Sequence, residues 1–294
     1  MGVRWINLGF DAEKLNSAKE VESPIFPKWS LKPPEQLHML PMRFMSKKHL
    51  LASWAIALML ASIPAGSAVP NAPTPLLVEL FTSEGCSSCP PADAFLRNLD
   101  SKQPVPGVQF IVLEEHVDYW DGDGWKDPFS SHEFTVRQTE YAQRLHVAEP
   151  YTPEMVVDGA FEFVGNDGNR AAQVFEKAVT APAIPIRISS VAVSDGTLHA
   201  HIEADPAPEK AEVWIALAID HAESQVLKGE NGGHHLEHVA VVKKLSEIGK
   251  LDKQHGFSKD ITLKSITQPS RIVAFLQQPG QGKVVGAAMA QVQP

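Results

Sequence analysis

The chain has 294 residues and a formal net charge of −9 at pH 7, with 35 Asp and Glu against 26 Lys and Arg. This acidic balance disfavours nucleic acid and anionic membrane surfaces as partners. The sequence contains no phosphate-binding glycine loop, HExxH motif or nucleophile-elbow serine, so nucleotide-using enzymes, metalloproteases and hydrolases have no support.

The N-terminal part has the three regions of a signal peptide. Residues 45–49 are basic, residues 50–63 are apolar and residues 66–68 are small, which predicts cleavage after Ala68. The apolar run is shorter than the roughly 20 residues of a membrane-spanning helix. We therefore expect a periplasmic or secreted mature chain without a membrane span. A retained N-terminal anchor is the alternative.

Residues 1–44 fit poorly ahead of this signal peptide, because a charged stretch at 11–22 and several prolines would precede its basic region. We expect translation to start at Met42 or Met45, which makes residues 1–44 a mis-annotated extension. An unstructured cytoplasmic extension is the alternative.

Residues 74–182 alternate between strand and helix patterns. An apolar strand at 76–81 precedes a helix that starts at about Pro90. Ser131 can cap a second helix, and Asp158-Gly159 is a strong hairpin signal. The other expected elements are a strand at 108–116, a loop rich in Trp, Asp and Gly at 118–130, strands at 155–157 and 161–164, and a closing helix at 166–180. This β-α-β-α-β-β-α order resembles the α/β thioredoxin fold.

Cys86 and Cys89 are the only cysteines, and they follow the first strand directly. A structural disulfide across about four residues would stabilise the fold by only about 2 kcal/mol, against about 3 for fifteen residues. In an exported protein the Cys-x-x-Cys motif favours redox chemistry instead. Cys86 would be the exposed nucleophile at the helix N-terminus, and Cys89 would resolve the mixed disulfide. The nearby carboxylates of Glu84 and Asp93 could raise the pKa of Cys86.

The resemblance to thioredoxins implies roles for two further positions. Thr152-Pro153 stands just before the third strand, where the thioredoxin fold places a cis-proline against the dithiol, and the Thr152 backbone would pair with an extended substrate. An ordinary trans bond is the alternative. Glu79 lies near the buried acid that relays a proton to the resolving cysteine in thioredoxins, although the spacing is one residue longer. Its alternative role is a solvated or salt-bridged strand residue.

Four stretches carry a closer likeness, at residues 78–93, 115–120, 125–130 and 151–153. Together they resemble a bacterial family of secreted thioredoxin-like proteins catalogued as domain of unknown function number 1223. The resemblance implies the fold and an envelope location, and it supplies no established substrate.

Residues 183–294 predict a second, all-β domain. At 198–204, apolar residues alternate with histidines and a glutamate, as in half-buried antiparallel strands. We expect a small β-sandwich with strands at 184–194, 198–204, 213–220, 261–263, 271–276 and 284–292.

Three histidines are candidate metal ligands. His116 ends the second strand and could bind Cu(I) or Zn together with two thiolates, although a hydrogen-bonding loop anchor is the favoured interpretation. His234 and His238 would share a face if residues 229–238 were helical. The family pattern keeps Gly-Glu-Asn from this segment but not its histidines, so a solvated loop-and-strand role is favoured.

The loop at 118–130 contains two tryptophans. Trp120 and Trp125 could form an apolar wall for a substrate, although packing within the loop is favoured.

These patterns favour a secreted or periplasmic thiol-disulfide oxidoreductase that acts through Cys86 and Cys89. It would need no cofactor besides this redox-active disulfide, and its redox partner would be a protein or a small thiol. The alternative is a non-catalytic thioredoxin-like module that binds a partner or handles copper or zinc. The direction of the reaction, the substrate, the role of the second domain and the oligomeric state are left open.

Overall fold

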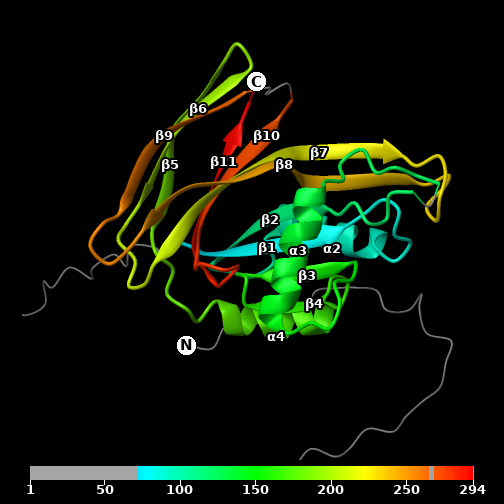
Figure 1. Ribbon diagram of the computed structural model, residues 1–294, viewed down its shortest axis with the longest axis horizontal. Coiled ribbons are helices and arrows are strands. Elements are labelled where there is room, and N and C mark those ends of the chain that lie inside the picture. The colour runs from blue at the N-terminus through cyan, green and yellow to red at the C-terminus, as the bar shows by residue number, and fades with distance from the viewer. Residues whose placement is uncertain (1–71, 123, 265–267, 294) are drawn as a thin grey trace, which may run out of the picture. The chain divides into compact units, whose positions relative to one another are not determined.

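The computed structural model describes residues 72–122, 124–264 and 268–293 (Figure 1). The expected N-terminal extension (1–44) and signal peptide (45–68) lie outside these residues. Within the described part of the chain, no helix is long and apolar enough to cross a membrane. The architecture is mixed α/β, with a large mixed sheet and a second, smaller antiparallel sheet.

The first half of the described chain builds one side of the large sheet. Its elements are β1 (Thr74–Thr82), α2 (Pro90–Lys102), β2 (Val108–His116), α3 (His132–Leu145), β3 (Glu154–Val157), β4 (Phe161–Val164) and α4 (Gly168–Ala178). β1 pairs in parallel with β2 and antiparallel with β3, which gives the order β2-β1-β3-β4. The expected elements are confirmed here, including Ser131 as the N-cap of α3.

One face of this half-sheet is covered by α2. The Thr82 hydroxyl at the end of β1 donates a hydrogen bond to Asp93 of α2 at 2.7 Å. Thr82 pairs with His116 of β2, and residues two apart on a strand share a face. Glu114 and His116 therefore lie on the face that α2 covers.

The opposite face is covered by α3. Phe81 of β1 packs edge-on against Tyr141 of α3, with ring centroids 6.0 Å apart. Glu79 shares this face with Phe81, and so does Glu115, which pairs with Phe81 in the β1–β2 ladder. The two faces therefore carry separate sets of buried acidic side chains.

The second half of the chain extends the same sheet and adds the smaller one. Its strands are β5 (Ile186–Ser194), β6 (Thr197–Ala204), β7 (Ala211–Gln225), β8 (His235–Leu251), β9 (Phe257–Lys264), β10 (Ser270–Gln277) and β11 (Val284–Val292). β8 pairs in parallel with β2 where Val241 lies beside Glu114. β5, β6 and β9 form the second sheet, and their apolar side chains share a core with those of β7 and β10. β2 belongs to the first expected domain and β8 to the second, yet both lie in one sheet. The division into domains at residue 183 stays a prediction.

β8 is the long strand that the sequence pattern missed. It forms an antiparallel ladder with β7 that places His238 opposite Ala222. The alternative in which His234 and His238 share a helical face is therefore wrong, because pairing with β7 holds the backbone extended from His235 onward. The favoured loop-and-strand role agrees with the structure for His234, whereas His238 is buried and not solvated. His234 precedes the strand and is exposed.

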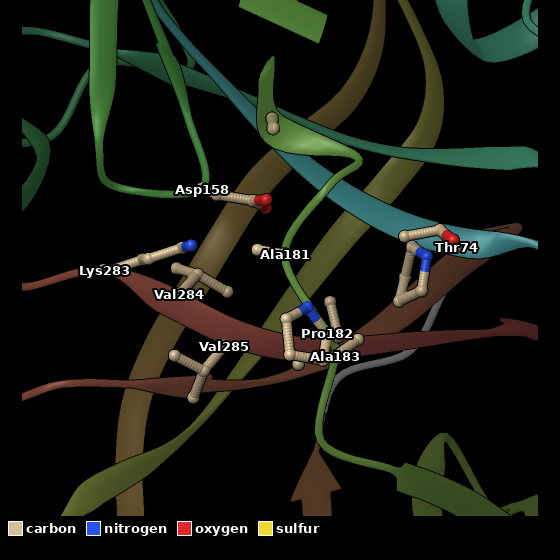
Figure 2. Close-up of a pocket in the computed structure, with 12 residues that line it drawn as sticks. Thr74, Asp158, Ala181, Pro182, Ala183, Lys283, Val284 and Val285 are labelled. Carbon is tan, nitrogen blue, oxygen red and sulfur yellow. The ribbon is translucent and has the colours of Figure 1, made fainter. Parts of the chain in front are cut away.

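Asp158 is a buried carboxyl in the turn between β3 and β4. Its Oδ1 accepts a hydrogen bond from the Leu77 amide at 2.9 Å. Figure 2 shows Asp158 and Lys283 in the wall of the same small pocket. Burial raises the pKa of Asp158 to about 7.

We expect Asp158→Asn to be more stable than the wild type at pH 8 and of similar stability at pH 4. The folded protein keeps a proton that the unfolded chain releases between about pH 4 and 7, so wild-type stability falls as the pH rises through this window. Each unit of pKa difference corresponds to about 1.4 kcal/mol. Asparagine keeps the acceptor for Leu77 and tolerates the φ of +48° at this position. Urea unfolding at both pH values measures the effect.

The matched control is Asp195→Asn. Asp195 also precedes a glycine in a turn, with a φ of +49°, but it is exposed. A pH-8 stability of Asp158→Asn at or below the wild-type value would contradict the assignment of a protonated, buried Asp158.

Candidate functional site

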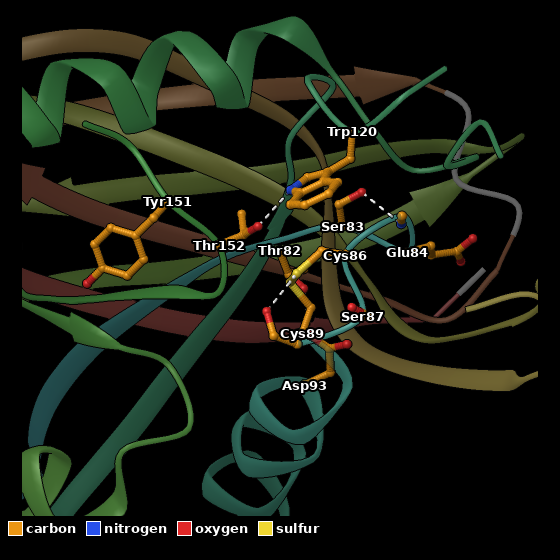
Figure 3. Close-up of a disulfide and its surroundings, with 12 residues drawn as sticks. Thr82, Ser83, Glu84, Cys86, Ser87, Cys89, Asp93, Trp120, Tyr151 and Thr152 are labelled. Atoms are coloured by element: carbon orange, nitrogen blue, oxygen red, sulfur yellow. Dashed lines mark hydrogen bonds between the residues drawn. A yellow bond between two sulfur atoms is a disulfide. The ribbon is translucent and has the colours of Figure 1, made fainter. Parts of the chain in front are cut away.

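Cys86 and Cys89 form a disulfide between β1 and α2 (Figure 3). Their Cα atoms are 5.5 Å apart. α2 begins directly after Cys89 because Pro90 and Pro91 occupy the first helical positions, where no intrahelical N–H donor is needed. The disulfide therefore lies at the positive end of the helix dipole, which stabilises a thiolate once the bond is reduced.

Cys86 is not exposed, contrary to the expectation from its place in the motif. Both cysteines are 0% exposed. Figure 3 shows the indole of Trp120 over the disulfide, and its Nε1 donates a hydrogen bond to the Thr152 hydroxyl at 2.7 Å. The prediction was wrong because this cover comes from a loop distant in sequence from the motif.

A second segment holds the loop between the two cysteines. Asn231 Nδ2 donates hydrogen bonds to the carbonyl oxygens of Glu84, at 2.8 Å, and Cys86, at 3.0 Å. The Ser87 amide donates to Glu230 Oε2 at 3.1 Å. The sequence pattern indicated the histidines of this segment as candidates, whereas Glu230 and Asn231 make the contacts with the cysteine loop.

We expect Asn231→Ala to lower the free energy of unfolding by about 1–3 kcal/mol, the cost of leaving buried polar groups without a partner. It should also speed reduction of the disulfide, because the Cys86 carbonyl loses its anchor. Urea unfolding and the rate of reduction by dithiothreitol measure the two effects. Asn166→Ala is the control, since Asn166 is exposed. Equal stability of the two variants would contradict the anchoring role.

The Thr152–Pro153 peptide bond is cis, and Pro153 is buried. The Pro153 carbonyl accepts a hydrogen bond from the Gly165 amide at 2.9 Å. Because the Thr152 hydroxyl accepts the bond from Trp120, this turn is joined directly to the cover of the disulfide (Figure 3). Pairing of Thr152 with a substrate backbone stays a prediction.

Glu79 is a salt-bridged strand residue. Arg137 Nε donates to its Oε1 at 2.7 Å, and the Tyr141 hydroxyl donates to its Oε2 at 2.7 Å. Both partners belong to α3, whereas the disulfide adjoins α2 on the other face of the sheet. Of the two alternatives for Glu79, the contacts support the salt bridge and give no link to Cys89.

Asp93 is the buried acid on the cysteine side. It lies four residues after Cys89, and positions i and i+4 share a helix face. Its Oδ1 accepts a hydrogen bond from the Thr82 hydroxyl, and burial together with nearby Glu114 raises its pKa to about 7. From the sequence, Asp93 is expected only to act as a charge near Cys86; its helical spacing from Cys89 is the signal for a closer role.

A cluster of histidines and carboxylates lies on the same face. His116 Nδ1 contacts Asp127 Oδ2 at 2.7 Å, so the loop-anchor interpretation of His116 agrees with the geometry. His238 Nδ1 contacts Glu114 Oε1 at 2.7 Å. Glu114, His116 and His238 each offer a ligand atom within 4.8 Å of the others. Sequence reasoning missed Glu114 because its pairing with His238 depends on the contact between β2 and β8.

The charges in this cluster stabilise one another. Burial alone would lower the pKa of His116, but the Asp127 and Glu114 carboxylates together outweigh burial and raise it to about 9. Burial alone would raise the pKa of Glu114, but His238 and His116 together outweigh burial and lower it to about 2. The cluster is therefore a buried network of opposite charges beside α2.

The sequence matches the family described as "Protein of unknown function (DUF1223)" over residues 77–277. The chain belongs to this family. The match runs from β1 to the end of β10, so it includes the disulfide, its covering segments and the histidine cluster. The family description assigns no function.

The fold is similar to a crystal structure of a protein from Agrobacterium tumefaciens solved as a structural genomics target. The two chains are 25% identical, with a TM-score of 0.59, and the similarity covers 74% of this chain and 94% of the other. No curated protein matches the chain.

Proposed function

We propose that the protein is a secreted or periplasmic thiol-disulfide oxidoreductase with a thioredoxin-like domain at residues 74–182. The observation that carries the proposal is the disulfide at the N-terminus of α2, covered by Trp120, which is hydrogen-bonded to Thr152. The strand order β2-β1-β3-β4 with α2, α3 and α4 supports it, because this is the arrangement of a thioredoxin core.

The chemistry is a two-step exchange of disulfide bonds. A partner thiolate attacks Sγ of Cys86, the bond to Cys89 breaks, and Cys89 leaves as a thiolate. A second partner thiolate then attacks the partner sulfur of the mixed disulfide, which releases Cys86 as a thiolate and oxidises the partner. Two electrons pass to the protein, and the reverse sequence returns them. Asp93, one turn after Cys89, is placed to supply the proton that converts the Cys89 thiolate to a thiol.

An envelope location supports this chemistry. Disulfides persist in oxidising compartments such as the bacterial periplasm. The signal-peptide pattern at residues 45–68 agrees with export. The redox partner would be a protein or a small thiol, because the chain has no second pair of cysteines.

One observation favours a second candidate, a non-catalytic binding or metal-handling module. Both cysteines are fully buried and the Trp120 indole lies over the disulfide, so a partner can reach Cys86 only after its surroundings open. If Trp120 never moves in the folded protein, the disulfide is structural.

Trapping a mixed disulfide separates the two candidates. Folded, reduced Cys89→Ser is expected to form a mixed disulfide with glutathione at Cys86 on addition of glutathione disulfide, as seen in the intact mass. Cys86→Ser is expected to react much more slowly, because the proposed mechanism assigns exchange with the partner to Cys86 and only the resolving step to Cys89. If neither folded variant reacts, the oxidoreductase is excluded and the binding module remains.

A further inference from the structure

The three side chains with metal-ligand spacing come from two strands that meet in the sheet. Glu114 and His116 are two residues apart on β2, so they lie on one face. His238 is brought beside them by the parallel pairing of β2 with β8 at Glu114 and Val241. His116 is 0% exposed and His238 1% exposed, so the site is closed to bulk solvent.

The distances suit one small cation. His116 Nε2 lies 3.6 Å from Glu114 Oε1, and His238 Nδ1 lies 2.7 Å from the same oxygen. Ligands of a tetrahedral zinc ion, with bonds of about 2.0–2.1 Å, are separated by about 3.4 Å. The three ligand atoms all lie within 4.8 Å of one another, so a cation between them requires the contact between His238 and Glu114 to open.

Each histidine has a carboxylate behind its second nitrogen. His116 Nδ1 contacts Asp127 Oδ2 at 2.7 Å, and His238 Nε2 faces Glu84 Oε1 at 3.4 Å. A carboxylate in this position fixes the tautomer and the ring orientation of a metal-binding histidine. Asp127 is itself held by the Glu84 amide at 2.8 Å, so these outer groups are fixed in place.

His116 Nε2 is a buried nitrogen without a hydrogen-bond partner. Such groups are rare in folded proteins and call for a bound species or another explanation. This nitrogen is on the side of the ring away from Asp127, and it faces Glu114. Three buried carboxylates, Glu84, Glu114 and Asp127, also favour a positive charge at this point.

An aromatic side chain closes the site. The ring of Phe129 packs edge-on against both histidines, with centroid distances of 5.4 Å to His116 and 5.7 Å to His238. An apolar wall of this kind lowers the local dielectric and limits access of water to a metal.

We propose that Glu114, His116 and His238 bind one divalent transition-metal cation, with Zn²⁺ as the best fit to two imidazoles and one carboxylate. Asp127 and Glu84 act as positioning residues for the two histidines. The three proposed ligands do not include a cysteine, so the proposal does not depend on the proposed redox function. A buried ion network without metal is the competing account.

Metal binding to the full chain with its disulfide intact tests the proposal. Chelator-treated protein is titrated with Zn²⁺ by calorimetry and with Co²⁺ by absorption spectroscopy. We expect one equivalent of each metal, with the intense visible bands of four-coordinate cobalt and a higher melting temperature with zinc. Absence of binding by the folded wild type would overturn the proposal and leave the ion network.

Variants locate the site. His116→Ala and His238→Ala should each abolish binding, whereas His234→Ala should bind as the wild type does, since His234 is exposed and outside the cluster. Asp127→Asn should weaken binding by about 10–100-fold and serves if the histidine variants do not fold. Normal binding by folded His116→Ala, or equal loss in His234→Ala, would overturn the assignment. Retained binding by a Cys86→Ser/Cys89→Ser double variant is expected, and its loss would place the metal at the cysteines instead.

Discussion

In Trp120→Ala, the Cys86–Cys89 disulfide is expected to be reduced at least about tenfold faster than in the wild type. Exposing the disulfide in this variant no longer requires breaking the hydrogen bond to Thr152, worth about 1 kcal/mol, or exposing an indole to water. The indole lies over a disulfide whose two cysteines are 0% exposed, so its movement must precede attack on Cys86. The measurement is the rate of thiol release with dithiothreitol in native buffer.

Two further variants separate the ring from its hydrogen bond. Trp120→Phe keeps an aromatic cover and loses only the bond to the Thr152 hydroxyl, so its rate should lie between those of the wild type and Trp120→Ala. Trp125→Phe is the matched control from the same loop, because Trp125 donates to Glu84 Oε2 instead. A rate for Trp120→Ala at or below the wild-type value would show that the indole does not control access.

Arg137→Met is expected to lower the free energy of unfolding by about 3–5 kcal/mol, the usual cost of removing one partner of a buried ion pair. Arg137 is 3% exposed at its side chain and contacts Glu79 Oε1 at 2.6 Å and Glu115 Oε2 at 3.7 Å. Without it, the buried Glu79 loses the cation that it contacts, and the buried Glu115, whose pKa burial and Glu79 already raise well above its usual range, loses the positive charge beside it. Urea unfolding measures the loss.

The second substitution in this cluster tests whether charge is the cause. Glu79→Gln should recover part of the stability lost in Arg137→Met, because it removes the buried carboxylate that Arg137 no longer neutralises. Arg144→Met is the control on the same helix, since Arg144 is exposed. Glu79→Gln alone should leave the rate of disulfide reduction unchanged, because Glu79 contacts α3 and not α2. Slower reduction of the Cys86–Cys89 disulfide in Glu79→Gln would instead support a role of Glu79 as a proton relay.

Local sequence patterns predicted the first half of the fold well. The apolar run of β1, the cap at Ser131 and the Asp158-Gly159 turn depend on neighbours within a few residues, and all three occur as expected. The position of the disulfide at the start of α2 also follows from local sequence, because the two prolines after Cys89 fix the first helical turn.

The missed features all depend on contacts between distant parts of the chain. Cys86 is buried by Trp120 and anchored by Asn231, neither of which the motif itself can indicate. β8 is extended because β7 pairs with it, although its own residues alternate poorly. The meeting of Glu114 with His238 likewise requires the pairing of β2 with β8.

The reduction potential of the Cys86–Cys89 couple tests the proposed function most directly. The full chain is equilibrated in glutathione buffers under native conditions, and its free thiols are then alkylated and counted. We expect a reversible couple between about −270 and −120 mV, the range of thioredoxin-like oxidoreductases, with Cys86 alkylating first. A disulfide that stays intact until the protein unfolds would contradict the redox account and identify the Cys86–Cys89 bond as structural.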